Sequence, residues 1–173
     1  MSRRLRKLSL TAHVTTSVGW LGSVAGFLAL AITGLTSSSD QAVRGSYIAM
    51  ELIGWYVIVP LSIASFLTGL LQSLSTTWGL FRHYWVLAKL LISVVATGLL
   101  LLHMTPTSQV AAVALERALT GGDLGALRVQ LVADATAAVA VLLIAVSLSI
   151  FKPRGLTPQG TKWQANRTDL QRS

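Results

Sequence analysis

Four long apolar stretches, separated by short polar segments, dominate the pattern along the chain. Each is long enough to cross a bilayer as a helix, because a helix rises about 1.5 Å per residue and the hydrocarbon core is about 30 Å thick. The apolar residues form continuous runs rather than the one-sided stripe of a helix packed on a soluble core. The pattern therefore predicts four membrane-spanning helices, over about residues 8–35, 46–74, 82–104 and 131–151.

The polar segments predict how these spans are joined. In the longer connection, residues 109–119 have helical periodicity, so we expect a separate helix lying on the membrane surface. Asp123 is a suitable N-cap for the fourth helix, and Pro60 should kink the second. We expect an all-α, four-helix transmembrane bundle over residues 1–154, followed by a polar and poorly ordered tail at 155–173.

Composition supports this fold class and excludes several others. Of the 173 residues, 53% are hydrophobic and only 12% are charged, whereas soluble domains carry about 25% charged residues. An ordinary soluble domain, a disordered chain and a nucleic-acid-binding module are therefore excluded, and the expected partner is the lipid bilayer. Because the chain has no cysteine, disulfides, thiolate metal sites and cysteine nucleophiles are excluded as well.

The basic residues predict the orientation of the spans. Lysine and arginine are most abundant in cytoplasmic loops, and here they gather at the two ends of the chain. With the N-terminus inside, ten of them lie on the inner side, while only Arg44, Arg117 and Arg128 lie on the outer side. We expect both termini to be cytoplasmic in a multi-pass protein of a bacterial cytoplasmic membrane.

Two basic residues lie within the spans at similar depth. His13 follows Lys7 by six residues, about 9 Å along a helix, and Lys89 follows Arg82 by seven, about 10 Å. Ionisable groups in hydrocarbon are costly and often mark function, and histidine can ligate haem iron or carry protons. The alternatives are a structural histidine bonded to a neighbouring helix and a lysine that extends to the nearby interface.

A second polar layer is expected near the outer ends of the spans. Thioether and imidazole groups suit Cu(I), and carboxylates can attract cations or pass protons. The candidate metal-binding residues of this layer are Met50, Glu51, His103 and Met104, with Asp134 at the same depth. The alternative is that the methionines only pack and that His103 ends a helix among the lipid headgroups.

Small residues four apart mark faces on which helices can approach closely. Such pairs occur at Gly22 and Gly26 on the first span and at Ser65 and Gly69 on the second. We expect the Gly22/Gly26 face to be a candidate for homo- or hetero-oligomer formation.

Two motifs resemble a known family. His13-x6-Trp20-Leu-Gly22 in the first span and Tyr-Trp85-Val-Leu-Ala-Lys89-Leu-Leu in the third are similar to motifs of the HemJ type of protoporphyrinogen oxidase. They also resemble its relatives in the copper-resistance CopD group. The membrane part from Leu8 to Met104 looks closest to an uncharacterised actinobacterial family of small four-helix membrane proteins related to that group.

The resemblance implies that His13 and Lys89 are the positions tied to haem and to activity. In the HemJ type, further Arg, Tyr and His residues end the first helix, whereas residues 27–32 of this chain are wholly apolar. The leading hypothesis is therefore a redox or accessory protein that binds b-type haem between helices, rather than an oxidase. The alternatives are a protein that handles copper or another cation and a structural partner subunit without a cofactor.

Overall fold

The structure is a computed structural model that describes residues 2–75, 83–116, 119, 124–151, 155, 157–158 and 160–163. Within these residues every regular element is a helix, which confirms the all-α fold class. Four helical stretches are long and apolar enough to cross a membrane, so the chain has the architecture of a multi-pass membrane protein. The elements are α1 (Arg3–Thr36), α2 (Asp40–Ile53), the π-helix η1 (Gly54–Ile58), α3 (Val59–Ser75), α4 (Tyr84–Glu116) and α5 (Gly125–Phe151).

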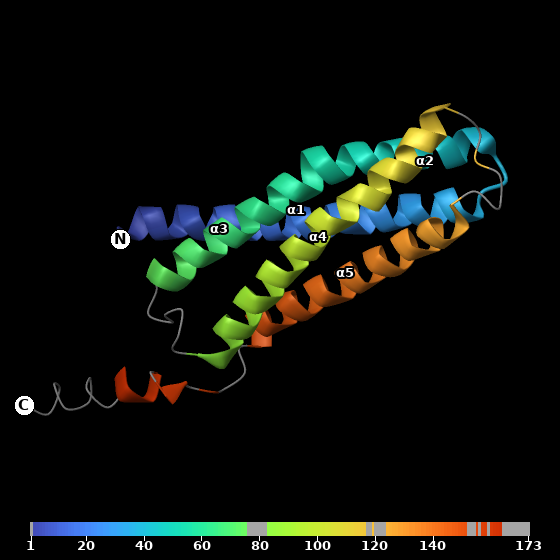
Figure 1. Ribbon diagram of the computed structural model, residues 1–173. Helices are drawn as coiled ribbons and strands as arrows, with labels where there is room; N and C mark the ends of the chain where they lie inside the picture. Colours follow the sequence, from blue (N-terminus) through green and yellow to red (C-terminus); the bar gives the residue numbers. More distant parts are fainter. Residues whose placement is uncertain are drawn as a thin grey trace, which may run out of the picture.

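The helices form a bundle in which successive crossings run in opposite directions (Figure 1). α1 packs against α2, α3 and α5, and α4 packs against the same three helices. The start of α1, the end of α3, the start of α4 and the end of α5 lie together, and we call this the N-terminal end of the bundle. The opposite end, where α1 ends and α5 begins, is the far end. Both termini of the membrane domain therefore lie on one side.

The second crossing is interrupted where Pro60 was expected to kink it. Residues 54–58 form a π-helical turn in which the Val59 N–H donates to the carbonyl of Gly54, five residues back. Pro60 lacks the N–H that would continue the α-helical ladder, and a π-turn is a common way to accommodate such a break. The crossing changes direction between α2 and α3 (Figure 1).

The third crossing is longer than expected, and the separate surface helix expected over residues 109–119 is not found. Residues up to Glu116 instead continue α4, which passes through Pro106 without a break. Thr107 donates its hydroxyl proton to the carbonyl of His103 at 2.8 Å, which adds a hydrogen bond next to the proline. Val110, Ala111 and Ala114 are fully buried, so packing against the bundle holds this extension in place.

Two arginines stabilise helix ends at the far end of the bundle. Arg44 donates to the carbonyls of Ala114 and Leu115 in the last turn of α4, at 2.6 and 3.0 Å. Carbonyls at a helix C-terminus lack intrahelical donors, and a cation there interacts favourably with the helix dipole. Arg44 therefore caps α4.

Arg128 lies near the start of α5, at the far end of the bundle, and is only 5% exposed. It donates to the carbonyl of Gly34 near the end of α1 at 2.6 Å and to the hydroxyl of Tyr47 at 3.0 Å. Its guanidinium also lies 5.6 Å from the centre of the Tyr47 ring, within the range of a cation–π contact. Arg128 thus joins α1, α2 and α5.

Several expectations fall on residues outside the described part of the chain. They include the Asp123 N-cap and most of the tail at 155–173. The described start of the tail contacts the bundle, because the Gly155 carbonyl accepts a hydrogen bond from the Tyr84 N–H at 3.4 Å and Thr157 is buried.

Candidate functional site

A cavity of about 780 Å³ opens between α1, α3, α4 and α5 toward the N-terminal end of the bundle. Both His13 and Lys89 line it, so the structure brings together the two residues that depth alone placed in one layer. Most of the lining is apolar and includes the aromatic side chains of Trp20, Phe66 and Trp85. Its volume falls within the roughly 300–1,000 Å³ typical of small-molecule and cofactor sites.

Hydrogen bonds from α3 determine the orientation of the His13 ring. Nδ1 lies 3.1 Å from the carbonyl oxygen of Ser65 and 3.1 Å from the hydroxyl of Thr68. A carbonyl can only accept, and the Thr68 hydroxyl donates its own proton to the carbonyl of Ala64 or of Ser65. Both partners of Nδ1 are therefore acceptors, so Nδ1 carries the proton.

The other nitrogen of His13 has a different environment. With Nδ1 protonated, Nε2 of a neutral imidazole has a free lone pair, and Nε2 makes no hydrogen bond with the residues that the structure describes. This is the arrangement typical of a metal-ligating histidine, whose second ring nitrogen donates to a backbone carbonyl. His13 therefore presents the chemistry of a ligand rather than that of a fully bonded structural histidine.

Gly69 allows the His13 ring to lie against α3. A Cβ added at Gly69 would lie 2.9 Å from Cε1 and 3.4 Å from Nδ1 of His13, so a larger residue would displace the ring. One turn earlier, the Ser65 hydroxyl lies 2.7 Å from the hydroxyl of Ser17. The Ser65/Gly69 pair is thus a packing face between α1 and α3, and it also positions His13.

Lys89 projects from α4 toward α5. Its Nζ donates to the hydroxyl of Ser149 at 2.7 Å, and that hydroxyl donates in turn to the carbonyl of Ala145 at 2.9 Å. The side chain is half-buried and forms no ion pair with the described residues. The ammonium group therefore has one neutral acceptor and no counter-charge from that part of the chain.

One further polar group lies beside the cavity. Ser9 is among the lining residues, and its hydroxyl oxygen is buried without a hydrogen-bond partner. Buried polar groups normally find a partner, so each exception calls for an explanation. Ser9 is therefore a lining residue whose hydroxyl has no partner among the described residues.

The candidate metal-binding residues are arranged differently from His13 and Lys89. Met50 and Met104 are 0% and 1% exposed, and Met104 lies against Gly54, where an added Cβ would be 2.8 Å from its sulfur. Glu51 is half-buried. The described residues contain no cluster of three or more His, Asp or Glu side chains that could hold a metal ion. Both thioethers are buried in the packed interior of the bundle, and the copper site remains a prediction.

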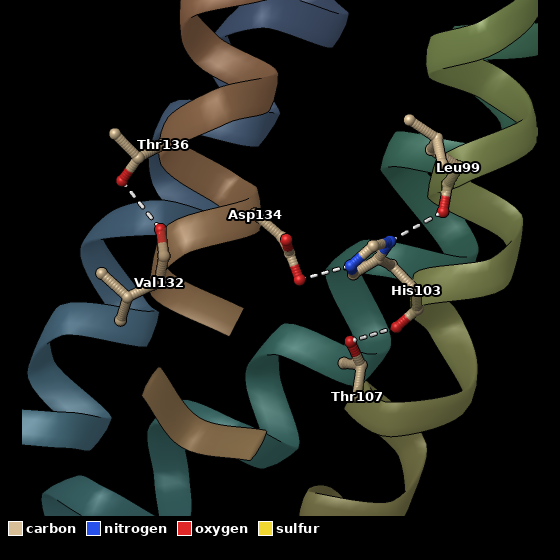
Figure 2. Close-up of polar contacts among 6 residues, drawn as sticks. All are labelled: Leu99, His103, Thr107, Val132, Asp134 and Thr136. Atoms are coloured by element: carbon tan, nitrogen blue, oxygen red, sulfur yellow. Dashed lines mark hydrogen bonds and ion pairs between the residues drawn. The ribbon is translucent and has the colours of Figure 1, made fainter. Parts of the chain in front are cut away.

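His103 pairs with Asp134 across α4 and α5 (Figure 2). Its Nδ1 lies 2.9 Å from the carbonyl of Leu99 and must carry a proton, since that carbonyl can only accept. Its Nε2 makes a short contact with a carboxylate oxygen of Asp134. Both ring nitrogens of His103 thus have partners, in contrast to those of His13.

The Gly22/Gly26 face is open. A Cβ added at either glycine would meet no atom within 4 Å, and both residues are exposed on the outer side of α1. Within the part of the chain that the structure describes, this face packs against no other helix, in contrast to the Ser65/Gly69 pair.

Comparisons with known proteins give no relative from which a role could be transferred. No family model, curated protein or solved structure matches the chain.

Proposed function

We propose that this multi-pass protein binds b-type haem in the cavity between α1, α3, α4 and α5, with His13 as axial ligand, and acts as a redox or accessory protein. The observation that carries the proposal is the state of His13, in which Nδ1 donates to α3 and Nε2 keeps a lone pair. In a cavity of about 780 Å³ with three aromatic side chains, such a nitrogen suits the iron of a large planar group.

The shortage of other ligands favours haem over a bare metal ion. A bare ion takes at least three or four ligands from the protein, whereas haem iron receives four nitrogens from its own macrocycle and needs one or two more. Among the described residues that line the cavity, His13 is the single histidine, and none of them is a carboxylate. One imidazole is therefore enough for haem and too little for a bare metal ion.

When bound, haem would supply one-electron chemistry, and the chain would supply its position and surroundings. Ser65 and Thr68 hold the His13 ring, and Trp20, Phe66 and Trp85 would supply apolar surface for the macrocycle. Hydrogen bonding of Nδ1 to a carbonyl raises the basicity of a ligating imidazole, which is one way in which proteins tune a metal.

We further propose that the membrane is the bacterial cytoplasmic membrane and that both termini are cytoplasmic. The N-terminal end of the bundle carries Arg3, Arg4, Arg6 and Lys7, and the segments that leave it are rich in lysine and arginine. The cavity would then open toward the cytoplasmic leaflet. Oligomers would form through the open Gly22/Gly26 face.

The test is an absorption spectrum of the detergent-purified protein, oxidised and then reduced with dithionite, after expression with supplied haem. We expect a Soret band that is lost in His13→Ala and kept in His103→Ala, a matched removal of a histidine whose ring nitrogens both have partners. A colourless wild-type protein, or equal spectra for the wild type and His13→Ala, would refute the assignment.

A further inference from the structure

Charge is distributed very unevenly along the bundle. Of the six acidic residues, Asp169 alone lies in the C-terminal tail, and the other five fall between residues 40 and 134. Asp40 begins α2 and Glu116 ends α4, both at the far end, and Asp134 lies in the first half of α5. The described part of the N-terminal end therefore holds cations without neighbouring carboxylates.

The cavity shares this imbalance. The described part of its lining contains two cationic side chains, Arg6 and Lys89, and no aspartate or glutamate. Arg6 lies in the first turns of α1, whereas His13 lies seven residues further along, about 10 Å deeper. Lys89 donates to Ser149, which lies two residues before Phe151, the last residue of α5. Arg6 thus lies nearer the cavity mouth than His13, and Lys89 extends toward the same end of the bundle.

A positive charge in this position requires an explanation. Lysine within a membrane segment is costly and is usually paired or exposed to water. The Lys89 ammonium is half-buried, donates to one neutral hydroxyl and has no carboxylate partner among the described residues. An oxyanion at the cavity mouth would pair with it and with Arg6, and charge-assisted hydrogen bonds of this kind are stronger than neutral ones.

We infer that the cavity mouth is a carboxylate-binding subsite, in which Lys89 and Arg6 bind acidic groups on one edge of the ligand whose centre lies at His13. This inference rests on the proposed function and adds to it the orientation of the ligand. Haem b suits such a subsite because its two carboxylates lie on one edge of an otherwise apolar ring. The phosphate of a lipid headgroup has the same oxyanion chemistry, but it belongs at the membrane surface rather than in a cavity lined by His13 and Trp20.

The experiment compares haem with haem dimethyl ester, in which both carboxylates are capped, by titration of the full-length protein in an uncharged detergent. We expect Lys89→Met to weaken haem binding about tenfold or more and to change ester binding much less, since only haem carries carboxylates that can form an ion pair with the Lys89 ammonium. Lys89→Arg keeps the charge and should restore most of the affinity for haem. Arg6→Gln should weaken haem binding selectively, whereas Lys7→Gln is the matched control, because Lys7 does not line the cavity.

The outcomes separate the two proposals. Equal loss of haem and ester binding in Lys89→Met would mean that Lys89 acts through packing, which overturns the subsite and leaves haem binding intact. Unchanged haem affinity in both Lys89→Met and Arg6→Gln would overturn the subsite as well. If phosphatidylglycerol added to the micelles abolishes the effect of Lys89→Met on haem binding, the cation serves a lipid headgroup and the subsite is again overturned. Failure of the wild type to bind either haem or the ester would refute the proposed function itself.

Discussion

Replacement of Gly69 by alanine is the sharpest single test of how the site is built. The new Cβ would lie 2.9 Å from Cε1 of His13, whereas carbon atoms in contact are about 3.5–4.0 Å apart. The imidazole must therefore move by roughly 0.6 Å or more, because α3 is a packed helix and the side chain is the easier part to move. The movement displaces Nε2 together with the rest of the ring.

Two opposing terms determine the effect of this substitution on stability. Alanine stabilises a helix interior by up to about 1 kcal/mol relative to glycine. Lengthening the 3.1 Å contacts of Nδ1 with Ser65 and Thr68 costs about 1 kcal/mol. The free energy of unfolding should therefore change little. The higher helix propensity of alanine does not compensate for the displaced ring in haem binding. The affinity of the protein for haem should therefore fall by about 1–2 kcal/mol, or roughly 5- to 30-fold.

The assay is a haem titration followed by Soret absorbance, with thermal denaturation of the same samples. Gly98→Ala is the matched control, because Gly98 lies in α4 with no atom within 4 Å of an added Cβ. It should leave haem affinity unchanged. Equal affinities of Gly69→Ala and Gly98→Ala would show that the ring position against α3 is irrelevant to binding and would refute the reasoning.

Three further predictions concern the fold. Gly34→Ala should destabilise the protein by about 1–3 kcal/mol, because the Cβ would lie 2.6 Å from the fully buried Tyr47 ring; a melting temperature equal to that of Gly98→Ala would contradict this. Asp134→Leu should lower the free energy of unfolding by about 0.6–1.7 kcal/mol, the range of hydrogen bonds within membranes. Asp134→Asn should lower it less, because an amide can still bond to Nε2 of His103. Identical melting curves for the two variants would argue against the His103–Asp134 pair. Pro60→Ala restores a backbone N–H and should straighten the second crossing. Spin labels at residues 45 and 71 would then report a longer distance between them. An unchanged distance would assign the π-turn to packing alone.

The helical crossings could be predicted from the sequence because a membrane span is a matter of length and hydropathy. The limits of α4 could not be predicted from the sequence. Pro106 is normally a reason to end a helix, but the buried residues beyond it pack against the bundle and keep the helix continuous. The contacts of Arg128 could not be predicted either. Its role depends on the Gly34 carbonyl, 94 residues away in the chain, which no local pattern reveals.

The candidate site was predictable in its residues but not in its chemistry. Depth along each helix placed His13 and Lys89 in one layer, and both line the same cavity. The proton on Nδ1 follows from partners on α3, and the hydroxyl that receives Lys89 comes from α5. Helix rotation determines both contacts, and rotation depends on packing rather than on hydropathy. The Ser65/Gly69 spacing indicated a close helix contact without showing that His13 occupies it.

The central claim is that Nε2 of His13 is the axial ligand of a haem. It can be tested by electron–nuclear double resonance on haem-loaded protein whose histidines carry ¹⁵N only at Nε2. We expect a ¹⁵N coupling from one axial imidazole, present in His103→Ala and absent from His13→Ala. A haem signal without that coupling, or a coupling that persists in His13→Ala, would contradict the account.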